Sequence, residues 1–205
     1  MTILAVGCSF LCYRSEIRPQ CVVMAEKMNV ELDNRSIPGN GNVHIVYNTM
    51  NALLENPNKY SLVLIGWSNP GRWDFVTAPH KWFSIKIGSI LATATNKKIN
   101  VDLTLFRHWA PQVVLLASWL RSIKVPFIMW NSLKCWHEDE SIWHKHILDM
   151  PEFYQPRICH IQDVEDNHQW VSPEDHHPSQ ISHNLWAEKL LAFYQQGNHL
   201  SHNLN

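Results

Sequence analysis

The sequence predicts a single α/β domain, residues 1–205, with a central parallel sheet of about five strands and helices on both faces. Short apolar runs typical of buried strands alternate along the chain with longer segments of helical periodicity. Such alternation indicates a parallel sheet whose crossover connections are helices. Hydrophobic residues make up 45% of the chain and charged residues 17%, as in a globular protein with a substantial core.

The first half of the chain supplies two strands and two helices in turn. The apolar run 3–6 predicts a buried strand that ends at Gly7, and residues 20–28 follow as a helix. Residues 30–37 alternate enough to predict a second strand, which Pro38 and the glycine after it terminate. Apolar residues recur at helical spacing over 42–55, so we expect an amphipathic helix there.

The second half continues the alternation. Residues 62–65 form the clearest buried strand, whereas residues 70–98 are irregular and aromatic and are interpreted as an insertion. Residues 101–122 predict a long helix interrupted near Pro111, since proline removes a backbone donor. The remaining elements are a fourth strand, a fifth strand and a closing helix, at 125–130, 158–162 and 182–195.

Composition also argues against some classes of partner, targeting segment and metal site. A net charge of −1 gives no reason to expect a nucleic acid or an anionic membrane as partner. The apolar N-terminal run lacks a basic region and a span of about 18 residues, so we expect neither a signal peptide nor a membrane span, and a cytoplasmic protein. The five scattered cysteines contain no CxxC pair, which favours free thiols over a zinc site.

Three polar segments that contain glycine each follow a predicted strand. They are residues 7–9, 38–40 and 66–69. In a parallel sheet, ligands bind beyond the carboxyl ends of the strands, and these ends share one edge. We therefore expect the three segments to meet at one rim of the sheet.

Ser9 is the candidate nucleophile, because its position after a buried strand and a glycine exposes its hydroxyl at the strand tip. A helix N-cap or a plain turn serine is the alternative interpretation. The candidate base is His177, in a loop before the last helix, with Asp175 to orient its ring. Glu174 is a second candidate for the orienting role, and His176 is a competing base.

An acyl-transfer site also needs donors aimed at the developing oxyanion. The candidates are the backbone N–H groups of Ser9 and Gly39, together with an N–H, hydroxyl or amide of Ser68 or Asn69. Glycine, asparagine and serine are equally common in ordinary turns, which is the alternative reading of these positions.

Four short segments resemble the conserved blocks of SGNH (GDSL-type) hydrolases. Residues 7–10, Gly-Cys-Ser-Phe, resemble the first block, with Cys8 in place of its aspartate, and residues 36–40 resemble the second. Residues 65–69 lie where the third block, Gly-x-Asn-Asp, belongs; strict alignment puts Ser68 on its asparagine, with Asn69 one place later. Residues 175–179 resemble the fifth block, although the spacing here is Asp-x-His rather than Asp-x-x-His.

The resemblance covers residues 7–179 in the family's order, and it implies a flavodoxin-like α/β/α sandwich. It further implies a serine esterase or acylhydrolase without a cofactor, whose catalytic residues are Ser9, Asp175 and His177 and whose oxyanion donors include Gly39. We expect an O-acyl carbohydrate or a small lipid as substrate. The alternatives are a catalytically degenerate binding or structural module, for instance virus-associated, and a different flavodoxin-like enzyme or cofactor binder.

Three tryptophans and one arginine each have a functional and a structural interpretation. Trp67, Trp73 and Trp82 either line an apolar acyl pocket or pack in the core, and Arg72 either binds a carboxylate or phosphate of the substrate or lies at the surface. The histidines and acids between 137 and 146 suggest a metal, but their spacing is not His-Glu-x-x-His, so we predict no metal site and a solvated helix face. Oligomeric state is not predicted.

Overall fold

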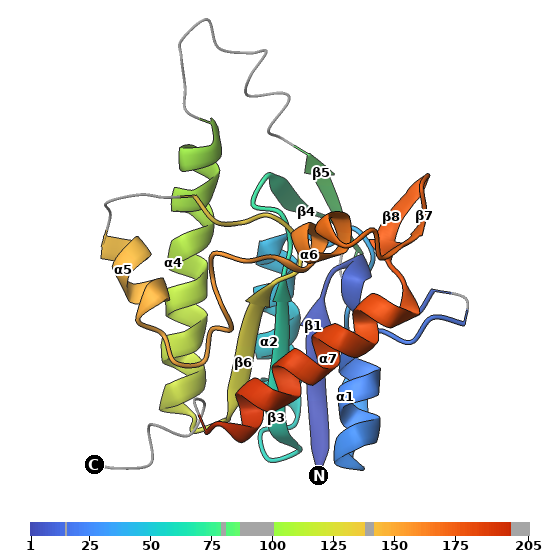
Figure 1. The fold of residues 1–205 in the computed structure, drawn as a ribbon. Coiled ribbons are helices and arrows are strands. Elements are labelled where there is room, and N and C mark those ends of the chain that lie inside the picture. Colours follow the sequence, from blue (N-terminus) through green and yellow to red (C-terminus); the bar gives the residue numbers. More distant parts are fainter. Residues whose placement is uncertain (15, 79–80, 87–100, 138–141, 198–205) are drawn as a thin grey trace, which may run out of the picture.

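The computed structural model has the predicted α/β architecture (Figure 1). It describes residues 1–14, 16–78, 81–86, 101–137 and 142–197. The strands β1 (Thr2–Gly7), β2 (Glu31–Asn34), β3 (Tyr60–Trp67) and β6 (Phe127–Asn131) form a parallel sheet in the order β2-β1-β3-β6. The sheet is the middle layer of the molecule.

Two pairs of helices cover the sheet. The helices α2 (Asn42–Glu55) and α4 (Val101–Ser122) pack on one face, and α1 (Gln20–Met28) and α7 (Gln180–Gln195) pack on the other (Figure 1). Successive strand residues point to opposite faces, so Leu4 lies in the core under α2 and α4, whereas Ile3 and Ala5 lie under α1 and α7. β1, β3 and β6 are buried on both faces, which is why they are largely apolar runs, whereas the edge strand β2 is polar and partly exposed.

The register of β1 and β3 sets the rim of the sheet. Gly7 lies opposite Gly66, and the side chain of Leu11 packs over both. A Cβ atom on Gly7 would stand 2.9 Å from the backbone oxygen of Gly66, so this position needs glycine. A Cβ atom on Gly66 would stand 2.5 Å from Leu11 Cδ1 and from Ser132 Oγ, so these side chains would have to move. Ser9 lies two residues beyond Gly7, and Ser68 lies two residues beyond Gly66, so both serines follow the same edge of the sheet.

The predicted fifth strand at 158–162 is wrong. Cys159 forms a single parallel bridge to Asn131, and the chain then turns into α6 (His160–Asp166). The segment before it runs along β6 but contains Pro151 and Pro156, which have no N–H to give to a ladder. The sheet of the described residues therefore has four strands.

The expected interruption of the long helix at Pro111 is also wrong, because α4 continues through this residue. A proline inside a helix costs about 3 kcal/mol. The apolar side of α4 offsets this cost, since Phe106, Trp109 and Val113 are fully buried against the sheet. Tertiary packing therefore outweighs the local preference.

The segment expected to be an irregular insertion begins as a β-hairpin. The strands β4 (Arg72–Ala78) and β5 (Lys81–Lys86) pair antiparallel, and residues 87–98 lie outside the described part of the chain. Asp74 attaches the hairpin to α2: its carboxylate accepts the N–H groups of Gly41 and His44, each at 2.8 Å. These are two of the N–H groups that the first turn of a helix leaves without partners.

Replacing Asp74 by alanine should therefore destabilise the protein, by about 1–2 kcal/mol, the usual cost of losing an N-terminal cap. Urea denaturation followed by circular dichroism measures this change. The exposed Asp149 is the matched control, and Asp149→Ala should stay within about 0.5 kcal/mol of wild type. Equal losses in both variants would contradict the role assigned to Asp74.

Candidate active site

Ser9 lies at the carboxyl end of β1 and begins the 3₁₀ turn η1 (Ser9–Leu11). The residue is half-buried, with Cys8 before it and Phe10 after it both buried. Because the first N–H groups of a helical turn have no acceptor within that turn, the N–H of Ser9 is available to a bound group. Ser9 thus presents a hydroxyl and a backbone donor at the same rim.

His177 and Asp175 reach Ser9 from the far end of the chain. They lie on β8 (Asp175–Pro178), which pairs antiparallel with β7 (Trp170–Ser172), so this segment is a short hairpin rather than the predicted loop. His177 Nε2 is 3.0 Å from Ser9 Oγ across 168 residues of sequence. The other ring nitrogen, His177 Nδ1, is 2.7 Å from Asp175 Oδ1. The three side chains form one hydrogen-bonded chain.

Asp175, and not Glu174, contacts the imidazole. Its Oδ1 also accepts hydrogen bonds from Arg14 Nη1 at 2.9 Å and from the His177 backbone N–H at 3.2 Å. Partial burial raises the pKa of Asp175, but the hydrogen bonds from His177 and Arg14 outweigh it and lower the pKa below its usual value. Glu174 is exposed and accepts a hydrogen bond from Ser172 instead.

His176, the competing base, points away from Ser9. Its Nε2 is 3.0 Å from the carbonyl oxygen of Pro173, and its ring stacks on Trp170 with centroids 5.4 Å apart. Neighbouring residues on a strand face opposite sides, so the sheet geometry that directs His177 to the serine directs His176 to solvent.

The predicted oxyanion donors differ in whether they are already hydrogen-bonded within the protein. Gly39 has a positive φ of 82°, and it follows Ile37, whose N–H donates to Gly7 O at 3.2 Å, so the loop of Gly39 adjoins the Ser9 segment. Ser68 is fully buried, and its N–H donates to Asn42 Oδ1 at 2.8 Å. The backbone N–H of Ser68 is therefore already used within the protein.

The side chain of Asn69 is also used within its own loop. Asn69 Oδ1 accepts the N–H of Gly71 at 2.8 Å, and its Nδ2 donates to Lys134 O at 3.4 Å. Sequence reasoning missed Asn42 and Arg14, which hold the third block and Asp175 respectively. Neither residue belongs to a motif, and the pairing of Arg14 with Asp175 joins positions 161 residues apart.

Phe10 packs between His177 and a buried polar cluster formed by His160, Ser182, His183 and Gln20. The ring of Phe10 lies between His177 and His160, with centroid distances of 5.6 and 5.5 Å. His160 Nε2 is 2.9 Å from Ser182 Oγ, and His183 Nδ1 is 2.6 Å from Gln20 Oε1. Burial, the main cause, lowers the pKa of His160 well below its usual value and that of His183 to about 4.

These two histidines predict acid sensitivity. Unfolded histidine has a pKa of about 6.5, so between pH 6.5 and about 4 the unfolded state binds more protons than the folded one. Their contribution to stability is full above pH 6.5 and is lost as the pH falls, with a slope of up to about 1.4 kcal/mol per pH unit for each histidine.

Urea denaturation at pH values from 7.5 to 4.5 measures this slope. We expect His183→Gln to flatten it, and His146→Gln, at an exposed histidine, to leave it unchanged. The same slope in His183→Gln and wild type would show that His183 does not cause the acid sensitivity.

The cysteines are free thiols in the folded chain. Burial raises the pKa of Cys12 and of Cys21 to about 12. Cys8, which stands where the family has aspartate, is fully buried, and burial raises its pKa too, although the Arg72 charge and the Ser68 hydroxyl act in the opposite direction. None of these thiols is prepared to act as a nucleophile.

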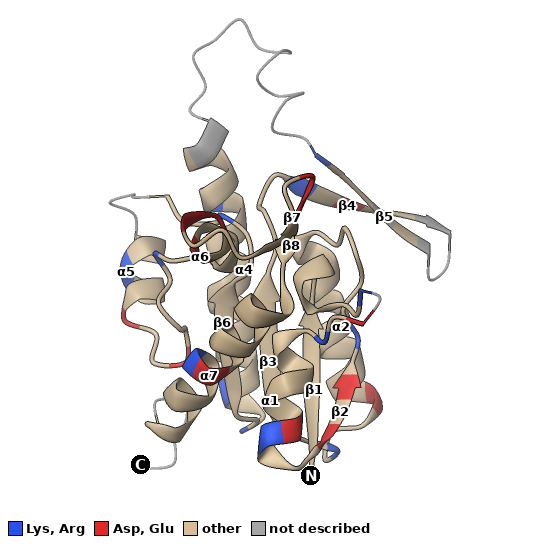
Figure 2. Cartoon of the chain, turned by 45° about the vertical axis from the view of Figure 1, so that its right-hand side comes forward, with Lys and Arg blue, Asp and Glu red and all other residues tan. Residues whose placement is uncertain are grey.

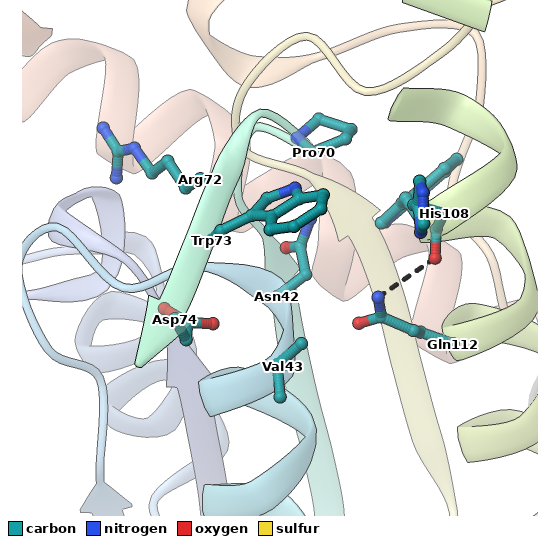
Figure 3. Close-up of a pocket in the computed structure, with 9 residues that line it drawn as sticks. Asn42, Val43, Pro70, Arg72, Trp73, Asp74, His108 and Gln112 are labelled. Carbon is teal, nitrogen blue, oxygen red and sulfur yellow. Dashed lines mark hydrogen bonds between the residues drawn. The ribbon is translucent and has the colours of Figure 1, made fainter. Parts of the chain in front are cut away.

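A pocket of about 290 Å³ lies beside the third block, between β4, α2 and α4. Trp73 points into it, opposite His108 and Gln112 (Figure 3). Of the other tryptophans considered, Trp67 is fully buried in the core, and Trp82 stacks on His44 with centroids 4.4 Å apart. The catalytic candidates do not line this pocket; it adjoins their rim from the α4 side.

Within the described residues, charged side chains and candidate metal ligands form no separate site. Basic and acidic residues lie next to one another at α1 and α7, as in the ion pair of Lys27 with Glu188 (Figure 2). In the described ranges no three histidine, cysteine or acidic side chains are grouped to hold a metal, and Glu138 and Asp139 lie outside those ranges. No described helix is both long and apolar enough to cross a membrane.

The fold and this geometry can be compared with known proteins. No protein-family model matches the sequence, and no curated protein sequence matches it. Among solved structures, the esterase EstA from Pseudoalteromonas sp., inhibited by monoethylphosphonate, is similar with a TM-score of 0.57 at 11% identity, over 95% of this chain and 97% of that chain.

Two further structures are similar to the chain as well. TesA has a TM-score of 0.53 at 12% identity over 96% of this chain and 99% of its own. The acetyl xylan esterase AlAXEase has a TM-score of 0.53 at 13% identity over 94% and 98%. The chain is thus an α/β/α sandwich of the flavodoxin-like kind. It shares this fold with the solved structures of EstA and AlAXEase, and the fold is the one that the resemblance of the four sequence blocks implies.

Proposed function

We propose that the protein is a serine esterase that cleaves small O-acyl esters through Ser9, His177 and Asp175. The observation that carries the proposal is the continuous chain of hydrogen bonds, 3.0 Å from Ser9 Oγ to His177 Nε2 and 2.7 Å from His177 Nδ1 to Asp175 Oδ1. A hydroxyl hydrogen-bonded to an oriented imidazole is the arrangement that activates a serine nucleophile. The shared fold with esterases supports the same proposal.

In the proposed reaction, Ser9 Oγ attacks the ester carbonyl carbon while its proton passes to His177 Nε2. Asp175 holds the Nδ1–H and stabilises the imidazolium that forms. The N–H groups of Ser9 and Gly39 stabilise the tetrahedral oxyanion. When the intermediate collapses, His177 returns the proton to the leaving alcohol, and a water molecule then releases the acyl group from Ser9 by the same steps.

An O-acylated carbohydrate or a small lipid is the proposed substrate class. One similar structure is an acetyl xylan esterase, and the pocket beside the third block combines an indole, an imidazole and an amide. Aromatic faces and amides suit the apolar and hydroxyl-bearing faces of a sugar ring or a short acyl chain. The alternative, a catalytically degenerate binding module, is less consistent with a serine and histidine in hydrogen-bond contact.

A fluorophosphonate probe tests the nucleophile. The probe should label the wild-type protein, and Ser9→Ala should lose the label together with hydrolysis of p-nitrophenyl acetate. Ser118→Ala, at an exposed serine on α4, should keep both. If the wild type is not labelled, or if Ser9→Ala is labelled equally, the proposal fails.

The adjacent histidines allow a matched test of the base. Replacing His177 by glutamine removes the proton acceptor and should lower kcat by about 10⁴-fold or more, as in other serine hydrolases. Replacing His176 by glutamine should change kcat by less than about threefold, because this ring faces away from Ser9. Steady-state kinetics with p-nitrophenyl acetate gives both values, and the opposite ranking would assign the base to His176.

A further inference from the structure

The polar side chains of the third block are buried or already bonded within the protein, so they contribute little to the proposed oxyanion site. Ser68 is fully buried, its N–H is bonded to Asn42, and its hydroxyl accepts a hydrogen bond from Arg72 Nη1 at 3.3 Å. The amide of Asn69 is bonded to Gly71 and Lys134. The polar side chains of the block are therefore used to build the rim.

Arg72 extends to this position from β4. Its guanidinium donates to Ser68, which lies two residues beyond the Gly66 that pairs with Gly7. Its charge also acts on the thiol of Cys8, the residue directly before Ser9. Figure 3 shows the side chain leaving the pocket, whereas that of Trp73 enters it, as the alternation of a strand requires. The guanidinium therefore lies on the side of β4 that faces Ser68.

Arg72 has no anionic partner among the described residues, in contrast to four other arginines of the chain. Arg14, Arg18, Arg35 and Arg121 each pair with a carboxylate. The nearest acid on its own strand, Asp74, is bonded to the N-terminus of α2. A half-buried guanidinium without a counter-ion is unfavourable unless a negative charge reaches it during function.

We propose that Arg72 donates an N–H to the oxyanion that forms on the ester carbonyl oxygen when Ser9 attacks. The inference rests on the proposed esterase function and goes beyond it by assigning a further donor to a residue outside the four blocks. The bond to Ser68 uses one of the five guanidinium N–H groups and fixes the plane of the rest. The step transfers no proton, because arginine stays protonated throughout; it is charge stabilisation only.

The experiment compares Arg72→Met and Arg72→Lys with wild type on two esters, p-nitrophenyl acetate and the anionic p-nitrophenyl hemisuccinate. Arg72→Met should lower kcat by about 10²–10³-fold, the usual cost of one oxyanion donor, with KM changed by less than about twofold on both esters. Arg72→Lys should recover part of the loss, because lysine keeps the positive charge but lacks the planar guanidinium with its paired N–H donors. Arg18→Met, at an exposed and ion-paired arginine, is the matched control and should keep wild-type kcat.

A second measurement separates a chemical role from a structural one. Guanidinium chloride at millimolar concentration should raise the kcat of Arg72→Ala several-fold and leave wild type unchanged. An unchanged kcat in Arg72→Met overturns the inference. So does a loss confined to KM on the hemisuccinate, which would make Arg72 a carboxylate anchor. In both cases endpoint labelling of Ser9 by the fluorophosphonate shows that the proposed function stands. If wild type itself is not labelled, both proposals fail.

Discussion

The close approach of Gly7 and Gly66 in neighbouring strands controls where the candidate site residues lie. A side chain on Gly7 would collide with the backbone oxygen of Gly66, and the side chain of Leu11 packs over both positions. The two strands therefore end in register, and the segments that carry Ser9 and Ser68 leave the sheet together. The β8 hairpin and the Gly39 loop are then placed against that edge by short hydrogen bonds.

Much of the fold could be predicted because its signals are local. The helix predicted over 42–55 is α2 with the same bounds. It could be predicted because the apolar residues of its buried face recur at helical spacing along the sequence. The errors have tertiary causes: core packing carries α4 through Pro111, and two prolines prevent a strand before α6. The hairpin in the aromatic segment is held by Asp74 on a distant helix, which local patterns do not reveal.

The candidate site likewise contains some residues that the sequence predicts and others that it does not. Ser9 and His177 could be found because short blocks keep their order along the chain, and the structure brings the two side chains into contact. Arg14 and Asn42 could not be assigned roles, and Arg72 could be interpreted only as a ligand of a substrate carboxylate or phosphate or as a surface residue. Each of the three acts through one contact with a residue that belongs to a block. A single contact between residues far apart in sequence leaves no periodicity or spacing by which it can be recognised.

The attachment of Asp74 to α2 has a consequence for selectivity. Arg72 and Trp73 are neighbours on one strand and face opposite sides, so a slip of β4 by a single residue would exchange them. The indole would then stand at the serine and the guanidinium in the apolar cavity. The first turn of α2 therefore acts as the fixed reference against which this strand is aligned, and the arrangement of both faces depends on a carboxylate that bonds to that turn.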